Sequence, residues 1–161
     1  MTKFLIFLHL ILVSNLYSFE LKCTFEEVYS DGSVQNGFFL IKDKKLRYEY
    51  NSEDLFTIFH SNERFFMVKN NDKEIINTIT ENTEIIKELL NIANNFPNIE
   101  EEYISEDLKI KLEKNSKGSF LRRISIASTT IKMSIFLNDC KNTKINARYF
   151  IHNPFFDYKF N

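Results

Sequence analysis

The chain has 161 residues and a formal net charge of −1, so one domain is expected and an overall basic character is excluded. Without a basic surface, binding to nucleic acid and strong adhesion to anionic lipid headgroups are both disfavoured. The 17 phenylalanines and 7 tyrosines predict a large buried surface, because aromatic side chains cover wide areas.

Residues 1–18 have the pattern of a secretory signal peptide. Lys3 precedes the apolar run 4–13, and Ser14 and Ser18 supply small residues after it. The run is shorter than the roughly 20 apolar residues that cross a bilayer. Cleavage after Ser18 removes one lysine and no acidic residue, which moves the formal charge from −1 to −2. We expect a periplasmic protein with a single domain over residues 19–161; a retained N-terminal anchor is the alternative.

Cys23 and Cys140 are the two cysteines, and both follow the predicted signal peptide. An oxidising compartment favours a disulfide between them, with two buried free thiols as the alternative. The bond would close a loop of about 117 residues (140 − 23), which a chain-entropy argument values at roughly 4–5 kcal/mol. Lys22 directly precedes Cys23, where a lipoprotein signal has a small residue, so we expect no acyl anchor there.

Between residues 25 and 79, apolar and polar positions mostly alternate, which predicts β-strands. The runs recur about every 10 residues, a spacing typical of an antiparallel meander. Turn signals separate the runs at Asp31-Gly32, Asp43-Lys44, Asn62-Glu63 and Asn70-Asn71-Asp72. Segments 38–41, 55–59 and 65–68 are apolar on both faces, so each needs a cover on both sides.

One helix is predicted in the mature chain, where apolar residues recur at helical spacing. These residues are Ile85, Ile86, Leu89, Leu90, Ile92, Ala93 and Phe96. Thr80, Asn82 or Thr83 is the expected N-cap, and Pro97 ends the helix.

Strands are predicted again after this helix. Their apolar positions lie in segments 108–112, 124–126 and 131–137, with turns at Lys117-Gly118 and Asn138-Asp139. Residues 149–160 are strongly aromatic and predict a closing strand or tail.

One helix cannot cover both faces of a sheet of about ten strands. We therefore predict a mainly β fold with one or two helices (α+β), in which a curved antiparallel sheet forms an incomplete barrel around a hydrophobic cavity lidded by a helix. A tightly packed sandwich without a cavity is the alternative. The predicted cavity wall consists of Phe39, Leu40, Tyr48, Phe56, Ile58, Phe66, Val68, Ile86 and Leu90. Period two alone does not decide which member of each neighbouring pair faces inward.

Segment 31–50 resembles the periplasmic outer-membrane lipoprotein carrier family (LolA-like). The similar pattern is an Asp31-Gly32 turn, Gly37 at the head of a strand, and the run Leu46-Arg47-Tyr48-Glu49-Tyr50. Segments 55–67 and 145–154 are also similar to the family. The family opens with a helix for which this chain leaves little room before Cys23.

The resemblance implies a carrier of acylated lipoproteins. Such a carrier accepts its cargo from an inner-membrane exporter, shields the acyl chains and passes them to an outer-membrane receptor. The resemblance also implies a basic gating residue that ties down the lid, and Lys42 or Arg47 is the candidate, facing the predicted helix. A solvated side chain on a polar strand face is the alternative for both.

No catalytic or metal-binding pattern is evident in the sequence. His60 and His152 are isolated from cysteines and paired acids, and no nucleophile elbow, phosphate loop or C-x-x-C occurs. We therefore expect a monomeric protein that is not an enzyme and has no cofactor or metal. An alternative function is a periplasmic module on the same scaffold that senses lipids or lipoproteins, or binds a partner, without transport. A lipid-active enzyme would need a nucleophile and base that the sequence does not display.

Overall fold

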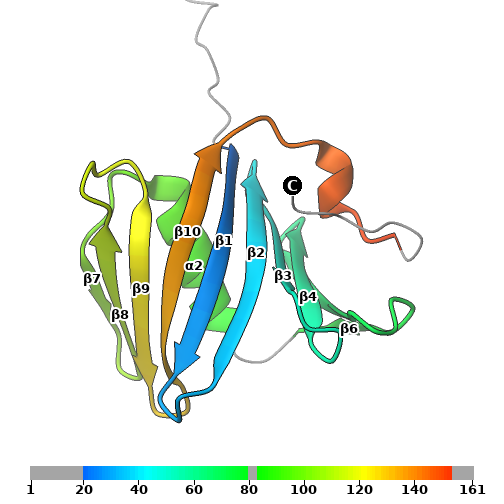
Figure 1. The fold of residues 1–161 in the computed structure, drawn as a ribbon, viewed down its shortest axis with the longest axis horizontal. Coiled ribbons are helices and arrows are strands. Elements are labelled where there is room, and N and C mark those ends of the chain that lie inside the picture. Colours follow the sequence, from blue (N-terminus) through cyan, green and yellow to red (C-terminus); the bar gives the residue numbers. More distant parts are fainter. Residues whose placement is uncertain (1–19, 80–82, 154–161) are drawn as a thin grey trace, which may run out of the picture.

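The computed structural model describes residues 20–79 and 83–153, so the predicted signal peptide lies outside the described residues. Ten strands form one antiparallel sheet in the order β6-β5-β4-β3-β2-β1-β10-β9-β8-β7 (Figure 1). Their bounds are β1 Glu20–Tyr29, β2 Val34–Lys42, β3 Lys45–Tyr50, β4 Phe56–Ser61, β5 Arg64–Lys69, β6 Ile76–Thr78, β7 Glu102–Ile104, β8 Leu108–Lys114, β9 Leu121–Ser128 and β10 Lys132–Asn142. A mainly β fold with an open antiparallel sheet is therefore confirmed.

The two edge strands of the sheet, β6 and β7, follow each other in the chain. The connection between them contains α2, which spans Thr83–Asn95 and lies across one face of the sheet (Figure 1). We call this the helix side of the sheet and the opposite surface the back face. The predicted helix is confirmed over these residues, and its last residue lies just before Phe96-Pro97, because a proline disfavours helical geometry in the residue before it. The candidate caps Thr80 and Asn82 lie outside the described residues.

Two of the hairpins have two-residue turns with a left-handed backbone. Asp43 and Lys44 have φ of 49° and 63°, and Asn62 and Glu63 have φ of 52° and 61°. Positive φ at both central residues is the geometry of a type I′ turn, whose twist matches that of the flanking strands. The turns predicted at these two places are confirmed.

The turn predicted at Asn138-Asp139 is wrong, because β10 continues through it to Asn142. Lys22 pairs with Lys141 while Thr24 pairs with Asn138, so Asp139 and Cys140 together lie opposite Cys23. Two residues facing one define a β-bulge. Asp139 has φ of 48°, a conformation that aspartate tolerates in turns and in bulges alike. The bulge turns Cys140 to the side of the sheet that Cys23 occupies.

The closing segment differs from the predicted strand at its start, since Ala147–Phe150 form a short 3₁₀ helix, η1. Asn146 caps η1, and its side chain accepts a hydrogen bond of 3.0 Å from the backbone N–H of Arg148. The predicted tail beyond residue 153 lies outside the described residues.

The segment that contains η1 covers the back face of the central strands. Its Ile145 and Phe150 form a buried cluster with Phe38 and Leu40 of β2. This cluster explains why β2 is apolar on both faces: one face is directed to the helix side and the other lies under the C-terminal segment. The predicted need for two covers is met at β2 by α2 and by the segment 145–150.

Candidate functional site

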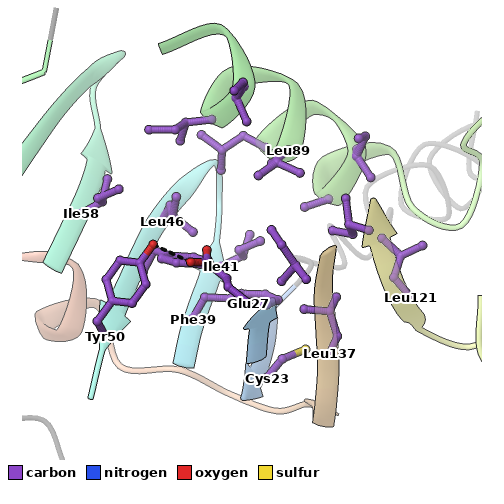
Figure 2. A pocket seen from close by; sticks show the side chains of 18 of the residues that line it. Cys23, Glu27, Phe39, Ile41, Leu46, Tyr50, Ile58, Leu89, Leu121 and Leu137 are labelled. Carbon is purple, nitrogen blue, oxygen red and sulfur yellow. Dashed lines mark hydrogen bonds between the residues drawn. The ribbon is translucent and has the colours of Figure 1, made fainter. Parts of the chain in front are cut away.

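A pocket of about 570 Å³ lies between α2 and the helix side of the sheet (Figure 2). Strands from both halves of the sheet contribute to it, with Ile41 and Ile58 on one side of β1 and Leu137 and Leu121 on the other. Because the sheet is an antiparallel meander, alternate residues of each strand bring their side chains to this one face. The pocket walls are thus built almost wholly from apolar side chains.

The face of α2 that points to the sheet forms the remaining wall. Ile85, Ile86, Leu89 and Ala93 line the pocket, together with the buried Leu90. The first four are only half-buried although they face the sheet. Part of the accessible surface of these four side chains therefore faces the pocket.

Six of the residues predicted for the cavity wall line this pocket. They are Phe39, Tyr48, Phe56, Ile58, Ile86 and Leu90. The strand residues among them share one phase of the period-two alternation, which places them on the helix side.

The prediction is wrong for Leu40, Phe66 and Val68, which lie in the opposite phase on the back face. Leu40 is fully buried in the cluster under η1. Phe66 stacks on Phe59 with ring centroids 5.1 Å apart, and Val68 lies beside Thr57 on β4. A shift of one residue along a strand exchanges the two faces, so each error is an error of phase.

Lys42 lies on the back face and not against α2, which corrects the gating prediction for this residue. Its Nζ lies 2.9 Å from a carboxylate oxygen of Glu20 and donates a 2.8 Å hydrogen bond to the carbonyl of Ile145. Glu20 also accepts a hydrogen bond from the backbone N–H of Ile145, and this bond, with help from Lys42, lowers the pKa of Glu20. The two side chains fasten the start of the C-terminal segment to β1 and β2.

Arg47 is buried on the same back face, so the gating prediction is wrong here too. Its guanidinium pairs with Glu49 at 2.5 Å and donates to the carbonyl of Tyr149 at 3.2 Å. The guanidinium carbon also lies 5.3 Å from the ring centre of Phe59, in cation–π range. Arg47 therefore stabilises the closing segment against β3 and β4, away from the pocket.

Cys23 and Cys140 are joined by a disulfide with an S–S distance of 2.06 Å, the pairing that the sequence predicts. Both residues line the pocket (Figure 2 labels Cys23). The bulge at Asp139 makes this possible, since regular alternation from Leu137 would direct Asp139 and not Cys140 to the helix side.

A polar group that the sequence reasoning missed lies in the same pocket. Glu27 of β1 is only 2% exposed, and its carboxylate accepts hydrogen bonds from three tyrosine hydroxyls. The distances are 2.7 Å from Tyr29, 2.6 Å from Tyr48 and 2.9 Å from Tyr50; Figure 2 shows the bond from Tyr50. The signal was present, because Glu27 occupies a phase of β1 that is otherwise filled by Leu21, Cys23 and Phe25.

The tyrosines of this group, which we call the Glu27 cluster (Glu27, Tyr29, Tyr48 and Tyr50), resist ionisation. Burial, with the hydrogen bond to Glu27, raises the pKa of Tyr29 to about 12. Burial and then the negative charge of Glu27 raise the pKa of Tyr48 and of Tyr50. The hydroxyls therefore remain protonated and available as donors to the carboxylate through the physiological range.

Over residues 20–79 and 83–153, no helix has the length and apolar character needed to span a bilayer, and no group of three His, Cys, Asp or Glu residues is arranged for a metal ion. Comparison with models of known protein families gives no match, and comparison with curated protein sequences gives no significant match.

Proposed function

We propose that this protein binds the acyl chains of lipoproteins in the pocket between α2 and the sheet, and carries them through the periplasm from the inner to the outer membrane. The observation that supports binding is the pocket itself, which is about 570 Å³ in volume and has apolar walls from both the sheet and α2. Pockets of roughly 300–1,000 Å³ with apolar walls are typical of small-molecule sites. The predicted signal peptide and the resemblance of segment 31–50 to lipoprotein carriers support the transport step.

The energetics of an acyl chain favour such a site. Exposure of the chain to water costs about 0.8 kcal/mol per methylene, so a lipidated protein needs a continuous apolar cover while it crosses an aqueous compartment. Ile85, Ile86, Leu89 and Ala93 of α2 line the pocket and are only partly buried, so a chain between helix and sheet would cover them as well.

In this proposal α2 is the lid of the pocket. At the edges of the sheet the helix is connected to β6 and β7, which have three residues each and are the shortest strands of the described chain. Short edge strands have few ladder hydrogen bonds, and such regions open at low free-energy cost. The lid can then move to admit and release a chain while the long central strands stay in place.

The test of binding is a titration of the purified protein with a tri-acylated lipopeptide, with the same peptide lacking acyl chains as the control. Saturable binding that requires the acyl chains supports the proposal. A folded protein that binds neither peptide contradicts it. A second titration measures transfer of the lipopeptide from donor to acceptor vesicles, because a sensing module would bind the chains without accelerating transfer.

A pair of variants on α2 links binding to the pocket. Ile86→Asp places a carboxylate in the pocket wall, whereas Lys87→Asp adds the same group at the next, exposed position of the helix. Burial of a charge against an acyl chain without a partner is costly, so we expect at least a tenfold loss of lipopeptide affinity in Ile86→Asp only. If both variants are folded and bind the lipopeptide with equal affinity, the lipopeptide does not bind in this pocket.

A further inference from the structure

The Glu27 cluster places a carboxylate in the wall of the apolar pocket. Glu27 is buried and lines the pocket, and among the described residues its hydrogen bonds come from Tyr29, Tyr48 and Tyr50. In the part of the chain that the structure describes, no lysine or arginine pairs with it. A buried carboxylate is usually paired with a cation or accepts hydrogen bonds from neighbouring donors. The carboxylate of Glu27 accepts hydrogen bonds but is not paired with a cation of the described chain.

One oxygen of the carboxylate has acceptor capacity left. Oε2 accepts from Tyr29 and Tyr50, whereas Oε1 accepts only from Tyr48. Each carboxylate oxygen has two lone pairs, so Oε1 can accept one more hydrogen bond from a ligand. A ligand that supplies both a hydrogen-bond donor and a positive charge would fill the free acceptor position of Oε1 and would pair with the carboxylate.

Aromatic rings surround this carboxylate. The ring of Phe25 stacks on Tyr48 at 4.1 Å and meets Tyr50 edge-on at 5.5 Å, and Tyr50 contacts Phe56 at 5.1 Å between ring centres. The faces of aromatic rings attract cations, and an ammonium group among rings beside a carboxylate is a recurrent recognition mode. Tyr48, Tyr50 and Phe56 all line the pocket.

The polar lining residues also gather at one side of the pocket. Asn77 and Thr78 of β6 lie on the same half of the sheet as Tyr48 and Tyr50, while the walls from β9, β10 and α2 are apolar. Glu27 lies four residues from Cys23 along β1, which is about 13 Å in an extended strand. Residues that line the pocket therefore extend about this far from Glu27 along β1.

We infer that the Glu27 cluster is a subsite for the ammonium group of an acylated lipid that carries a free amine, and that the alkyl chain of this lipid fills the apolar part of the pocket. The inference rests on the proposed function for the chain-binding part and adds the identity of the headgroup. Two natural sources share this chemistry: the free amino terminus of a diacylated lipoprotein, and the ethanolamine headgroup of a phospholipid.

The test compares three probes with the same twelve-carbon chain, dodecylammonium, dodecanol and dodecanoate, by titration of the full-length protein below their micellar concentrations. A hydrogen bond to a charged group is stronger than one between neutral groups, so we expect dodecylammonium to bind at least about tenfold more tightly than dodecanol, and dodecanoate to bind most weakly. Glu27→Gln should reduce the preference for the ammonium to within about twofold. Glu26→Gln removes a carboxylate at the neighbouring, exposed position of β1 outside the pocket and should keep the preference.

The sources are then separated with two ligand pairs: a diacylated lipopeptide with a free or an N-acetylated amino terminus, and lysophosphatidylethanolamine against lysophosphatidylglycerol. The pair that shows discrimination by the unaltered protein and none by Glu27→Gln identifies the source. Equal binding of the three twelve-carbon probes would overturn the headgroup inference and leave chain binding intact. Absence of binding by all three would instead contradict the proposed function. The probe series on the unaltered protein decides the inference even if Glu27→Gln does not fold.

Discussion

Gly37 permits the close approach of β1, β2 and β3 beside the Glu27 cluster. A Cβ atom at this position would overlap the carbonyl oxygen of Glu49 and the ring of Phe25. That ring is fixed by its stacking on Tyr48 at 4.1 Å, so it cannot move aside without loss of the stack. The position therefore needs a residue without a side chain.

We expect Gly37→Ala to lower the free energy of unfolding by about 1–3 kcal/mol, because overpacking forces strands or rings apart. Urea denaturation followed by far-UV circular dichroism measures this change. Asn36→Ala, at the exposed neighbouring position of β2, is the matched control and should stay within about 0.5 kcal/mol of the unaltered protein. A Gly37→Ala protein as stable as the control would contradict the close approach.

The Glu27 cluster also predicts how stability depends on alkaline pH. The pKa of Tyr29 is raised to about 12 in the folded protein, and an unfolded tyrosine titrates near 10. A raised folded pKa contributes stability that is fully present below pH 10 and is lost as the pH rises through about 12. The midpoint of urea unfolding should therefore fall as the pH increases above 10, and fall less steeply in Tyr29→Phe. If the urea midpoint depends on pH with the same slope in both proteins, the ionisation of Tyr29 is not coupled to folding.

At the scale of elements, the first and last strands of the chain, β1 and β10, pair with each other at the centre of the sheet. The Cys23–Cys140 disulfide crosses this contact and closes a loop with a sequence separation of 117 residues. Loops of this length lose much conformational entropy in the unfolded chain when they are cross-linked.

Reduction of the disulfide should cost about 2–5 kcal/mol of unfolding free energy. The measurement is urea unfolding with and without dithiothreitol, and the control is the double variant Cys23→Ala/Cys140→Ala. We expect the reductant to destabilise the unaltered protein and to leave the double variant unchanged. Equal stability of the oxidised and reduced unaltered protein would contradict a stabilising role for the bond.

Local sequence signals sufficed for most of the elements. The turns Asp43-Lys44 and Asn62-Glu63 and the helix before Pro97 were all predictable, because turn chemistry, helical periodicity and proline act over a few residues. Asn138-Asp139 was misread for the same reason. Its left-handed backbone suits a turn or a bulge, and only the pairing of β10 with the distant β1 decides between them.

The candidate site was only partly predictable. Alternation groups Phe39 with Ile41 and separates both from Leu40, but it does not say which set lies under α2. That choice depends on the C-terminal segment, whose η1 helix covers Leu40 from a position over 100 residues away in the chain. The burial of Glu27 was not predicted, because a charged residue in a strand is ordinarily assigned to the solvated face. Two of its tyrosine partners, Tyr48 and Tyr50, also come from another strand, so local sequence does not reveal them.

For the whole molecule, the two faces of one sheet are covered in different ways. The back face is covered at β2 by a compact cluster of Phe38, Leu40, Ile145 and Phe150. The helix side keeps a pocket of about 570 Å³ between the strands and α2. In the described chain the helix side combines apolar walls with this space, so it is the side on which we propose that an acyl chain binds.

The central claim is tested most directly by the position of a bound chain. An acylated lipopeptide with a nitroxide on its acyl chain broadens the methyl NMR signals of nearby side chains. We expect saturable broadening of the signals of Ile58, Ile86 and Leu90 in the pocket, with the signals of Leu40 and Val68 on the back face unaffected. Broadening that is equal on the two faces, or absent from the pocket methyls at saturation, would contradict an acyl-binding pocket under α2.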